Sequence, residues 1–357
     1  MGKEMIDVGV IQFINAPYRD DSYTYLQEHY PIRLHIATFN FEDNHPEWEY
    51  KNKAAGTNDS IKSFLKQEKY GALIICGYSE KVSRQALIYA RLHGIPIVMM
   101  VDTVEGHKLK RIKRVIYSSV DSFWVPGDRS RKYLLSKKVD ISKIYTGGYT
   151  YDYRSIKKRI DILDRNKLRS DIGILDNEFV FLFVGKLIPT RRIKDLICAF
   201  RGMKEENIRL IVIGDGEEQA LIDQAVQSDK RIISIPKVNL EHLYDYYSIA
   251  DAYIHPGKEP YSCAVMQATA AALPVIATDA VGAVDDYMNT RETNLIIKLG
   301  DIPSMRKSMK AVCHDYKEYK QSALEIQSYV CENLSIDYAA DQLYKAIMHA
   351  IGMKNHD

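Results

Sequence analysis

The chain has 357 residues, of which 46% are hydrophobic, and its 49 Lys and Arg oppose 47 Asp and Glu for a formal net charge of +2. This composition excludes an intrinsically disordered chain, and the length is enough for two domains that each bury a core. The five cysteines are scattered without a CxxC pair, which excludes a small disulfide scaffold and is typical of a reducing cytoplasm.

The first half alternates short apolar runs with helix-like segments, which is the pattern of a parallel sheet with helical crossovers. The expected strands cover Val8–Phe13, Arg33–Phe39, Ala72–Cys76, Ile95–Val101, Ser122–Val125 and Lys143–Thr146. The expected helices cover Asp59–Glu68, Ser83–His93 and Ser130–Lys137. The long polar segment 40–58 contains Trp48, and because long loops are often functional, Trp48 is a candidate binding residue.

A charged connection over residues 149–177 separates this half from a second βα pattern. The second half has expected strands at Phe179–Val184, Arg209–Ile213, Ile232–Ile235, Ala252–His255 and Val275–Ala277, and expected helices at Ile193–Met203, Glu217–Gln227 and Ile336–Ile351. The predicted organisation is an α/β protein with domains at 1–165 and 166–334 and a C-terminal helix at 335–357.

No secretory or membrane-spanning segment is apparent. The N-terminal residues enter an alternating apolar segment without a signal-peptide core, and no stretch reaches 18 consecutive apolar residues. We therefore expect a cytoplasmic protein.

The near-zero net charge conceals an asymmetry. Residues 1–175 carry 29 Lys and Arg against 21 Asp and Glu, whereas residues 176–357 carry 20 against 26, giving +8 and −6. A basic half can meet an anionic membrane or a phosphorylated molecule, although a mixed solvated surface explains the same count. No nucleic-acid motif accompanies the charge, so nucleic acid is not an expected partner. The segment 108–116 reads as an amphipathic helix with a basic face, which can rest on anionic lipid.

Two segments of the second half carry the candidate chemistry. The strand ending at Val184 is followed by Gly185, Lys186 and Arg191, and two cations five residues apart can converge on one anion at the carboxyl edge of a sheet. An exposed basic loop explains the same residues. The turn at Gly214 is weak support, because tight βα turns need glycine whatever they bind.

The second segment begins after the strand ending at His255. A short loop presents Glu259, and Ser262 is a plausible N-cap for a helix through about Leu273. The free N–H groups at such a helix start form an anion site that the helix dipole strengthens. Gln267, about one and a half turns into the helix, either contacts the same ligand or is an ordinary polar position.

Over about residues 179–300, these ordered features resemble the retaining glycosyltransferases of family four, which have the GT-B fold. The matching segments are Phe183–Leu187 with Arg191, Ile213–Gly216, Leu243–Asp251, Glu259–Gln267 as the E-x7-E segment, Leu273–Thr278, Val281–Gly282 and Asn294–Leu295. The resemblance implies two Rossmann-like domains facing a central cleft, with the last helix packing back toward the first domain.

The implied reaction moves a hexosyl group from a nucleotide-sugar, UDP-linked rather than GDP-linked, to a glycan or lipid-linked acceptor with retention, in the synthesis of cell-surface polysaccharide or glycolipid. No metal or cofactor is expected, since fixed cations can stabilise the departing diphosphate. The implied catalytic residues are Lys186, Arg191, Glu259 and Asp102. The implied donor-binding residues are Gly185, Gly214, Lys237, Val238, Tyr261, Ser262, Cys263, Ala264 and Gln267. The basic first domain is expected to bind the acceptor and to contact the inner face of the cytoplasmic membrane.

The sequence departs from the family pattern at three positions. Gln267 stands where the second glutamate is usual, and Pro260 and Arg192 stand at usual glycine positions. In the first half, the candidate acceptor residues are Arg19, Trp48 and His107, and Asp102 follows an expected strand where the family often has a histidine; each has a solvated or capping alternative.

Three other functions are compatible with parts of the pattern. A nucleotide-sugar epimerase would share the fold, and a weakly active binding subunit would account for Gln267 and Pro260. A nicotinamide-dependent dehydrogenase is disfavoured because no GxGxxG follows the first strand of either half.

Overall fold

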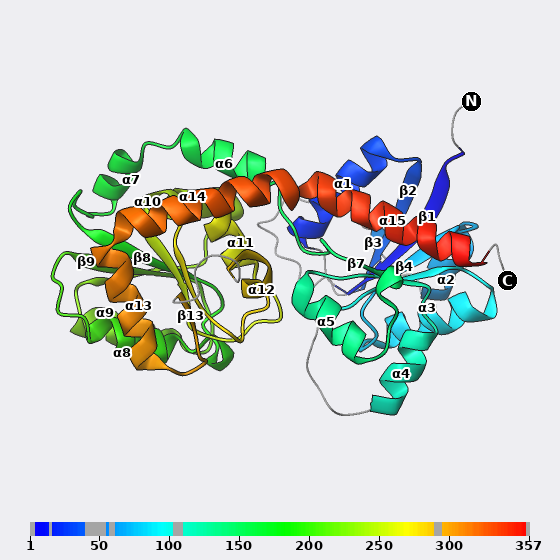
Figure 1. The fold of residues 1–357 in the computed structure, drawn as a ribbon, viewed down its shortest axis with the longest axis horizontal. Helices are drawn as coiled ribbons and strands as arrows, with labels where there is room; N and C mark the ends of the chain where they lie inside the picture. The colour runs from blue at the N-terminus through cyan, green and yellow to red at the C-terminus, as the bar shows by residue number, and fades with distance from the viewer. Residues whose placement is uncertain are drawn as a thin grey trace. The chain divides into compact units, whose positions relative to one another are not determined.

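The computed structural model of the chain describes residues 4–13, 16–39, 55–56, 61–102, 110–288 and 295–354. It divides into two compact units, one made of Met1–Tyr151 with Leu334–Asp357 and the other of Asp152–Asn333. Each unit is a parallel sheet covered by helices, so the predicted α/β class is confirmed (Figure 1). The candidate residues Trp48 and His107 lie outside the described residues.

In its described residues the first unit has a seven-stranded sheet with the order β3-β2-β1-β4-β5-β6-β7. The strands are β1 (Ile6–Gln12), β2 (Ile32–Thr38), β3 (Ala55–Gly56), β4 (Ala72–Cys76), β5 (Ile97–Met100), β6 (Ser122–Trp124) and β7 (Ile144–Tyr145). The helices are α1 (Pro17–His29), α2 (Ile61–Gln67), α3 (Lys81–Leu92), α4 (Lys110–Ser118), α5 (Asp128–Ser136) and α15 (Ile336–Lys354). The strands read as continuous apolar runs because helices cover both faces of the sheet.

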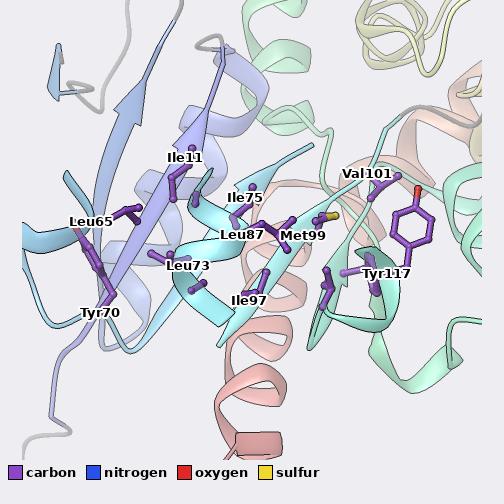
Figure 2. Packing of buried hydrophobic residues seen from close by; sticks show 14 of the residues in the cluster. Ile11, Leu65, Tyr70, Leu73, Ile75, Leu87, Ile97, Met99, Val101 and Tyr117 are labelled. Carbon is purple, nitrogen blue, oxygen red and sulfur yellow. The ribbon is translucent and has the colours of Figure 1, made fainter. Parts of the chain in front are cut away.

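The two faces of this sheet have separate hydrophobic cores. On one face, Leu73, Ile75, Ile97 and Met99 pack beneath α2 and α3, as Figure 2 shows. On the other face, α1 and α15 cover the alternate strand residues with small and branched side chains, among them Leu343. The last helix therefore belongs to the core of the first unit, although more than 180 residues separate it from the preceding part of that unit.

In the described residues of the second unit, six parallel strands follow the order β10-β9-β8-β11-β12-β13. They are β8 (Phe179–Val184), β9 (Ile208–Ile213), β10 (Ile232–Ile235), β11 (Ala252–His255), β12 (Val275–Thr278) and β13 (Ile296–Ile297). The helices are α6 (Tyr153–Asp161), α7 (Arg165–Asp171), α8 (Ile193–Arg201), α9 (Gln219–Ser228), α10 (Leu240–Ile249), α11 (Cys263–Ala270), α12 (Val284–Tyr287), α13 (Ile302–His314) and α14 (Tyr316–Asn333). In Figure 1, α8, α9 and α13 lie on one side of the sheet and α6, α7, α10 and α14 on the other.

The division between the units falls earlier than the sequence-based boundary at residue 165. The chain divides between Tyr151 and Asp152, so that α6 belongs to the second unit. Tertiary packing decides this, because α6 packs on α10, α11 and α14, and Tyr153 at its start is fully buried. The charged, loosely patterned sequence of α6 resembles a linker because one face of this helix is exposed.

A buried ion pair lies at the amino edge of the second sheet. Glu178, just before β8, accepts hydrogen bonds from Arg209 on β9, at 2.7 Å from Nε, and from the backbone N–H of Leu175, at 2.8 Å. Burial alone raises the pKa of Glu178, but the hydrogen bonds and the charge of Arg209 lower it below its usual value. Its ionised form is therefore stabilised in the folded protein.

We expect Glu178→Gln to lower the free energy of unfolding by about 1–3 kcal/mol at pH 7, since one charge-assisted hydrogen bond is weakened inside the protein. Because the folded-state pKa is below the ordinary 4.5, this contribution is complete above pH 4.5 and disappears as the pH falls through the lowered value. The difference between the two proteins should shrink in denaturant titrations at pH 7, 5, 4 and 3.5. A difference that stays constant, or that the exposed Glu206→Gln reproduces, would contradict the assignment.

Candidate functional site

The candidate site lies at the switch point of the second sheet. β8 and β11 are adjacent, but the chain leaves them toward opposite edges, and ligands of such sheets bind where the carboxyl ends of the strands diverge. The loop 185–192 follows β8 and the loop 256–262 follows β11. The backbone N–H of Lys258 donates to the carbonyl of Thr190 at 2.9 Å, so the two loops are fastened together. The fold thus brings together the two segments that the sequence singled out.

Two glycines permit other backbone segments to lie close to the loop 185–192. Gly214, after β9, has a φ of +149°, and a Cβ atom there would lie 1.9 Å from the carbonyl oxygen of Gly185. Gly257 has no room for a side chain either, since a Cβ atom would lie 2.4 Å from the Cα of Arg191. The glycines therefore set how closely these backbone segments pack around the site.

Arg191 and Glu259 form the centre of the site. The Nη2 of Arg191 donates to Oε1 of Glu259 at 2.5 Å, and its Nη1 donates to the carbonyl of Lys258 at 2.7 Å. The Nε2 of His255 lies 2.9 Å from the other carboxylate oxygen. Burial alone raises the pKa of Glu259, but the hydrogen bond from His255 and the charge of Arg191 lower it below its usual value. Glu259 is thus an ionised, oriented acceptor, and about a quarter of its side chain is exposed.

Lys186 occupies the same loop in a different state. Its side chain is exposed, and within the described ranges it has neither a hydrogen bond nor an ion pair. A lysine ammonium on such a loop is a mobile point charge that can reach an arriving anion. The guanidinium of Arg191 is therefore held by a carboxylate, whereas the ammonium of Lys186 is available to bind an anion.

Arg192, at a position where glycine is usual, adopts a backbone conformation typical of glycine. Its φ and ψ are +53° and +40°, in the left-handed region that glycine adopts most easily. Its guanidinium forms an ion pair with Asp195 at 2.6 Å. Arg192 thus occupies the glycine-like turn itself while its charge is taken up by a neighbour on α8.

The start of α11 has the geometry of an anion site. Ser262 caps the helix by accepting a hydrogen bond from the N–H of Val265 at 3.4 Å, and its φ of +128° is unusual for a residue with a side chain. The N–H of Ala264 has no acceptor among the described residues. At the other end of α11, Lys320 of α14 donates to the carbonyl of Ala272 at 2.7 Å. The helix is therefore held at its carboxyl end, and at its amino end the N–H of Ala264 remains available to an anion.

Of three further predicted donor-binding residues, two are buried and one is exposed. Gln267 is 4% exposed, and its Oε1 accepts a hydrogen bond from Tyr247 at 3.1 Å. Tyr261 is also buried and donates to the hydroxyl of Tyr287 at 3.4 Å, away from solvent. Lys237 is exposed on the loop between β10 and α10.

The remaining predicted donor-binding residues of the second unit, Val238 and Cys263, are partly buried. Val238 is partly buried between Lys237 and the N-cap of α10, and Cys263, at the start of α11, is also partly buried. Cys263 adjoins Ala264 at the amino end of the helix.

The first unit holds the other predicted residues. Asp102, after β5, accepts a hydrogen bond from the hydroxyl of Tyr149 at 2.7 Å. Arg19 on α1 is buried, with its Nη1 3.8 Å from the sulfur of Met100 and its guanidinium carbon 5.5 Å from the centre of the Tyr18 ring. The solvated alternative for Arg19 is therefore excluded, whereas its role as a binding residue stays a prediction.

His255 is the site residue that sequence reasoning missed. It was assigned only as the end of a strand, but its ring contacts the carboxylate of Glu259. The signal was present, because a histidine that closes an otherwise apolar buried strand needs a polar partner. Its distance of four residues from Glu259 crosses a loop, and the sequence does not show that the loop turns back on the strand.

The described residues contain neither a metal-binding cluster nor a membrane-spanning helix. No group of three or more His, Cys, Asp or Glu side chains in those ranges is arranged to hold a metal ion. No helix in the same ranges combines the length and apolar character needed to span a bilayer.

Comparison with known proteins points to one family. Residues 164–325 match the family model described as "Glycosyl transferases group 1". The chain is 26% identical over 230 residues to the capsular polysaccharide biosynthesis glycosyltransferase CapM of Staphylococcus aureus, covering 61% of this chain and 59% of that protein. It is 31% identical over 115 residues to the alpha-monoglucosyldiacylglycerol synthase of Acholeplasma laidlawii, covering 30% of this chain and 29% of that protein. The matches thus span between about a third and three fifths of these relatives.

A solved structure covers nearly the whole chain. The crystal structure of HepE from Anabaena in complex with UDP superimposes with a TM-score of 0.71 at 14% identity, covering 96% of this chain and 100% of that one. At this identity the likeness establishes the fold, which is the two-domain GT-B fold expected from the sequence.

Proposed function

Because residues 164–325 form a domain of the group 1 glycosyl transferases, we propose that the protein transfers a hexosyl group from a nucleotide-sugar to a glycan or lipid-linked acceptor. The single observation that supports this most directly is the arrangement of Arg191, Glu259 and the start of α11 at one switch point. A guanidinium and a helix amino end favour a diphosphate, and an oriented carboxylate beside them favours sugar hydroxyls.

The proposed chemistry needs little more than charge stabilisation. When the bond from the anomeric carbon to the diphosphate oxygen breaks, negative charge develops on the nucleoside diphosphate. Lys186, Arg191 and the N–H of Ala264 would stabilise that charge, and Glu259 would hold the transferred sugar through its hydroxyls. Retention at the anomeric carbon and independence of a metal are part of the proposal.

The nucleoside is proposed to bind along the same edge. Its base would lie near Lys237 and Val238, and Gln267 would face the ribose. Because a neutral amide both donates and accepts, Gln267 would bind ribose hydroxyls without the charge-assisted strength of a glutamate. We favour UDP over GDP, with the UDP complex of HepE as support.

The acceptor side of the proposal concerns the first unit. The first unit carries 24 Lys and Arg against 20 Asp and Glu, a net charge of +4, which favours an anionic or lipid-linked acceptor at the cytoplasmic face of a membrane. CapM and the diacylglycerol synthase, by their names, act in capsule and glycolipid synthesis. Part of that charge is already neutralised, since Arg131 and Lys132 both pair with Asp128 on α5. Arg19 is proposed to face the acceptor, and Asp102 is proposed as the catalytic residue of the first unit.

A thermal-shift screen of the whole chain tests the proposal. A ligand that binds only the folded protein raises its apparent stability, by about 2.7 kcal/mol at one hundred times the dissociation constant. We expect UDP and UDP-sugars to raise the melting temperature by several degrees, GDP less, and NAD not at all. Absence of a shift with every nucleotide and nucleotide-sugar would refute the proposal.

Product analysis separates the alternatives. Incubation with the selected nucleotide-sugar alone should leave the sugar unchanged, whereas an epimerase would convert it without an acceptor. Binding without transfer to any glycan or lipid acceptor would favour a binding subunit instead.

A further inference from the structure

His255 is buried in a way that packing does not explain. It is the last residue of β11, its side chain is 1% exposed, and the other three strand residues are apolar or aromatic and fully buried. Its Nδ1 atom is buried and has no hydrogen-bond partner among the described residues. An unsatisfied polar atom costs free energy that leucine at this position would not cost.

Within the part of the chain that the structure describes, the polar contact of the ring is with Glu259. Nε2 lies 2.9 Å from Oε2 of the carboxylate. The ionised carboxylate can only accept, so Nε2 carries the hydrogen in this pair. Arg191 donates to one oxygen of Glu259 and His255 to the other, and the side chain of Ser262 also forms a hydrogen bond with the carboxylate, so its orientation is restrained.

The two donors differ in their other proposed contacts. Arg191 would also bind the diphosphate under the proposed function, and the arrival of that dianion would compete with Glu259 for its N–H groups. His255 lies behind the loop, buried on the strand, and its bond to Glu259 does not depend on the ligand. Of these two donors, His255 is therefore the one whose hydrogen bond to Glu259 persists when the diphosphate is bound.

We propose that His255 is a positioning residue for the sugar end of the donor, which orients the carboxylate of Glu259 so that its exposed edge accepts hydroxyls of the transferred sugar. The inference rests on the proposed function and assigns the sugar selectivity of the site to a pair formed by β11 and the loop after it. Under this inference, His255 affects recognition of the sugar and leaves recognition of the nucleoside diphosphate unchanged.

The test compares a nucleotide with its nucleotide-sugar. Dissociation constants for UDP and UDP-glucose, or for GDP and GDP-mannose if the screen selects guanosine, are measured by calorimetry on the full chain. We expect His255→Leu to weaken UDP-glucose binding about 10-fold or more, as for loss of a hydrogen bond to a charged group, with UDP binding within about 2-fold of the unsubstituted protein. His255→Gln, which retains a donor, should recover most of the loss.

A buried control is available on α11. Thr269 is 5% exposed, and its hydroxyl donates to the carbonyl of Val265 at 2.9 Å without contacting Glu259. Thr269→Val removes this buried hydroxyl with little change in the size of the side chain and should leave both dissociation constants unchanged.

A double-mutant cycle guards against a variant that folds poorly. In a Glu259→Gln background, His255→Leu should cost much less affinity for UDP-glucose than it costs in the unsubstituted protein, since His255 is inferred to act through the carboxylate. Additive losses would overturn the inference.

The other outcomes are also decisive. Equal weakening of UDP and UDP-glucose by His255→Leu would mean a structural role and would overturn the inference while leaving the proposed function intact. So would full retention of UDP-glucose affinity, or a glutamine variant as weak as the leucine variant. If the unsubstituted protein binds neither member of either pair, the proposed function fails, and the inference fails with it.

Discussion

Arg191→Ala is expected to lower kcat/KM for sugar transfer by about 100- to 1000-fold, the range for removing one preorganised donor from a developing oxyanion. The loss should exceed that of Lys186→Ala, because Arg191 also orients Glu259 through Nη2, whereas Lys186 has no such contact within the described ranges. For Lys186→Ala we expect about 10- to 100-fold, mainly in kcat if the ammonium meets the diphosphate only as charge develops. Initial rates at varied donor concentration measure both.

Neighbouring cations provide the controls. Arg192→Ala removes an adjacent guanidinium that is paired with Asp195, and Lys194→Ala removes an exposed ammonium one turn further on. Both should retain transfer within about 3-fold, since surface charges away from the anion are screened by salt. Unchanged transfer in Lys186→Ala and Arg191→Ala together would show that the diphosphate assignment is wrong.

Gly214→Ala is expected to have the largest effect on stability. The added Cβ would lie 1.9 Å from the carbonyl oxygen of Gly185, a backbone atom that cannot rotate away, and the φ of +149° is unfavourable for any residue with a side chain. The backbone conformation alone costs about 1–3 kcal/mol, and the overlap adds to it. We expect the free energy of unfolding to fall by about 3 kcal/mol or more, with loss of the thermal shift by nucleotides, because the loop 185–192 must move.

Gly352→Ala is the matched control for this substitution. Gly352 lies within α15, and a Cβ atom added there would meet no other atom within 4 Å. Alanine should therefore stabilise the helix by up to about 1 kcal/mol. Denaturant titrations of both variants are compared with the unsubstituted chain. A Gly214→Ala protein whose free energy of unfolding lies within about 0.5 kcal/mol of that chain, the range of an ordinary surface substitution, would contradict the close packing of the turn at Gly214 against Gly185.

Buried strands were the most predictable elements. Ala72–Cys76, Phe179–Val184 and Ala252–His255 were predicted with the bounds that the structure shows, because a parallel strand covered on both faces is a continuous apolar run. The helix α1 was not predicted. Its first residues are polar and aromatic, and its buried side, with Tyr23 and Leu26, packs against α15 from the far end of the chain.

Helix ends and short strands were less predictable. The helix after Ser262 was expected to reach about Leu273 but ends at Ala270. Ala272, with a φ of +53°, lies in a turn whose carbonyl oxygen is bound by Lys320 of α14. β13 is two residues long and pairs with β12, which is too short a run for an apolar pattern. Such contacts depend on partners that are distant in the sequence.

For this protein, the order of apolar runs was sufficient to predict the α/β class, since that class depends on local periodicity, and the ordered motifs from Gly185 to Gln267 implied the GT-B fold through their resemblance to a known family. Only the tertiary structure decided that α6 belongs to the second unit, whereas the place of α15 in the first unit agrees with what the resemblance implied. It also decided that Arg191 pairs with Glu259 and that His255 supports this pair. Side-chain hydrogen bonds between loops depend on how closely the backbones approach, and that approach is set by strand order and by glycines whose packing partners are not neighbours in the sequence.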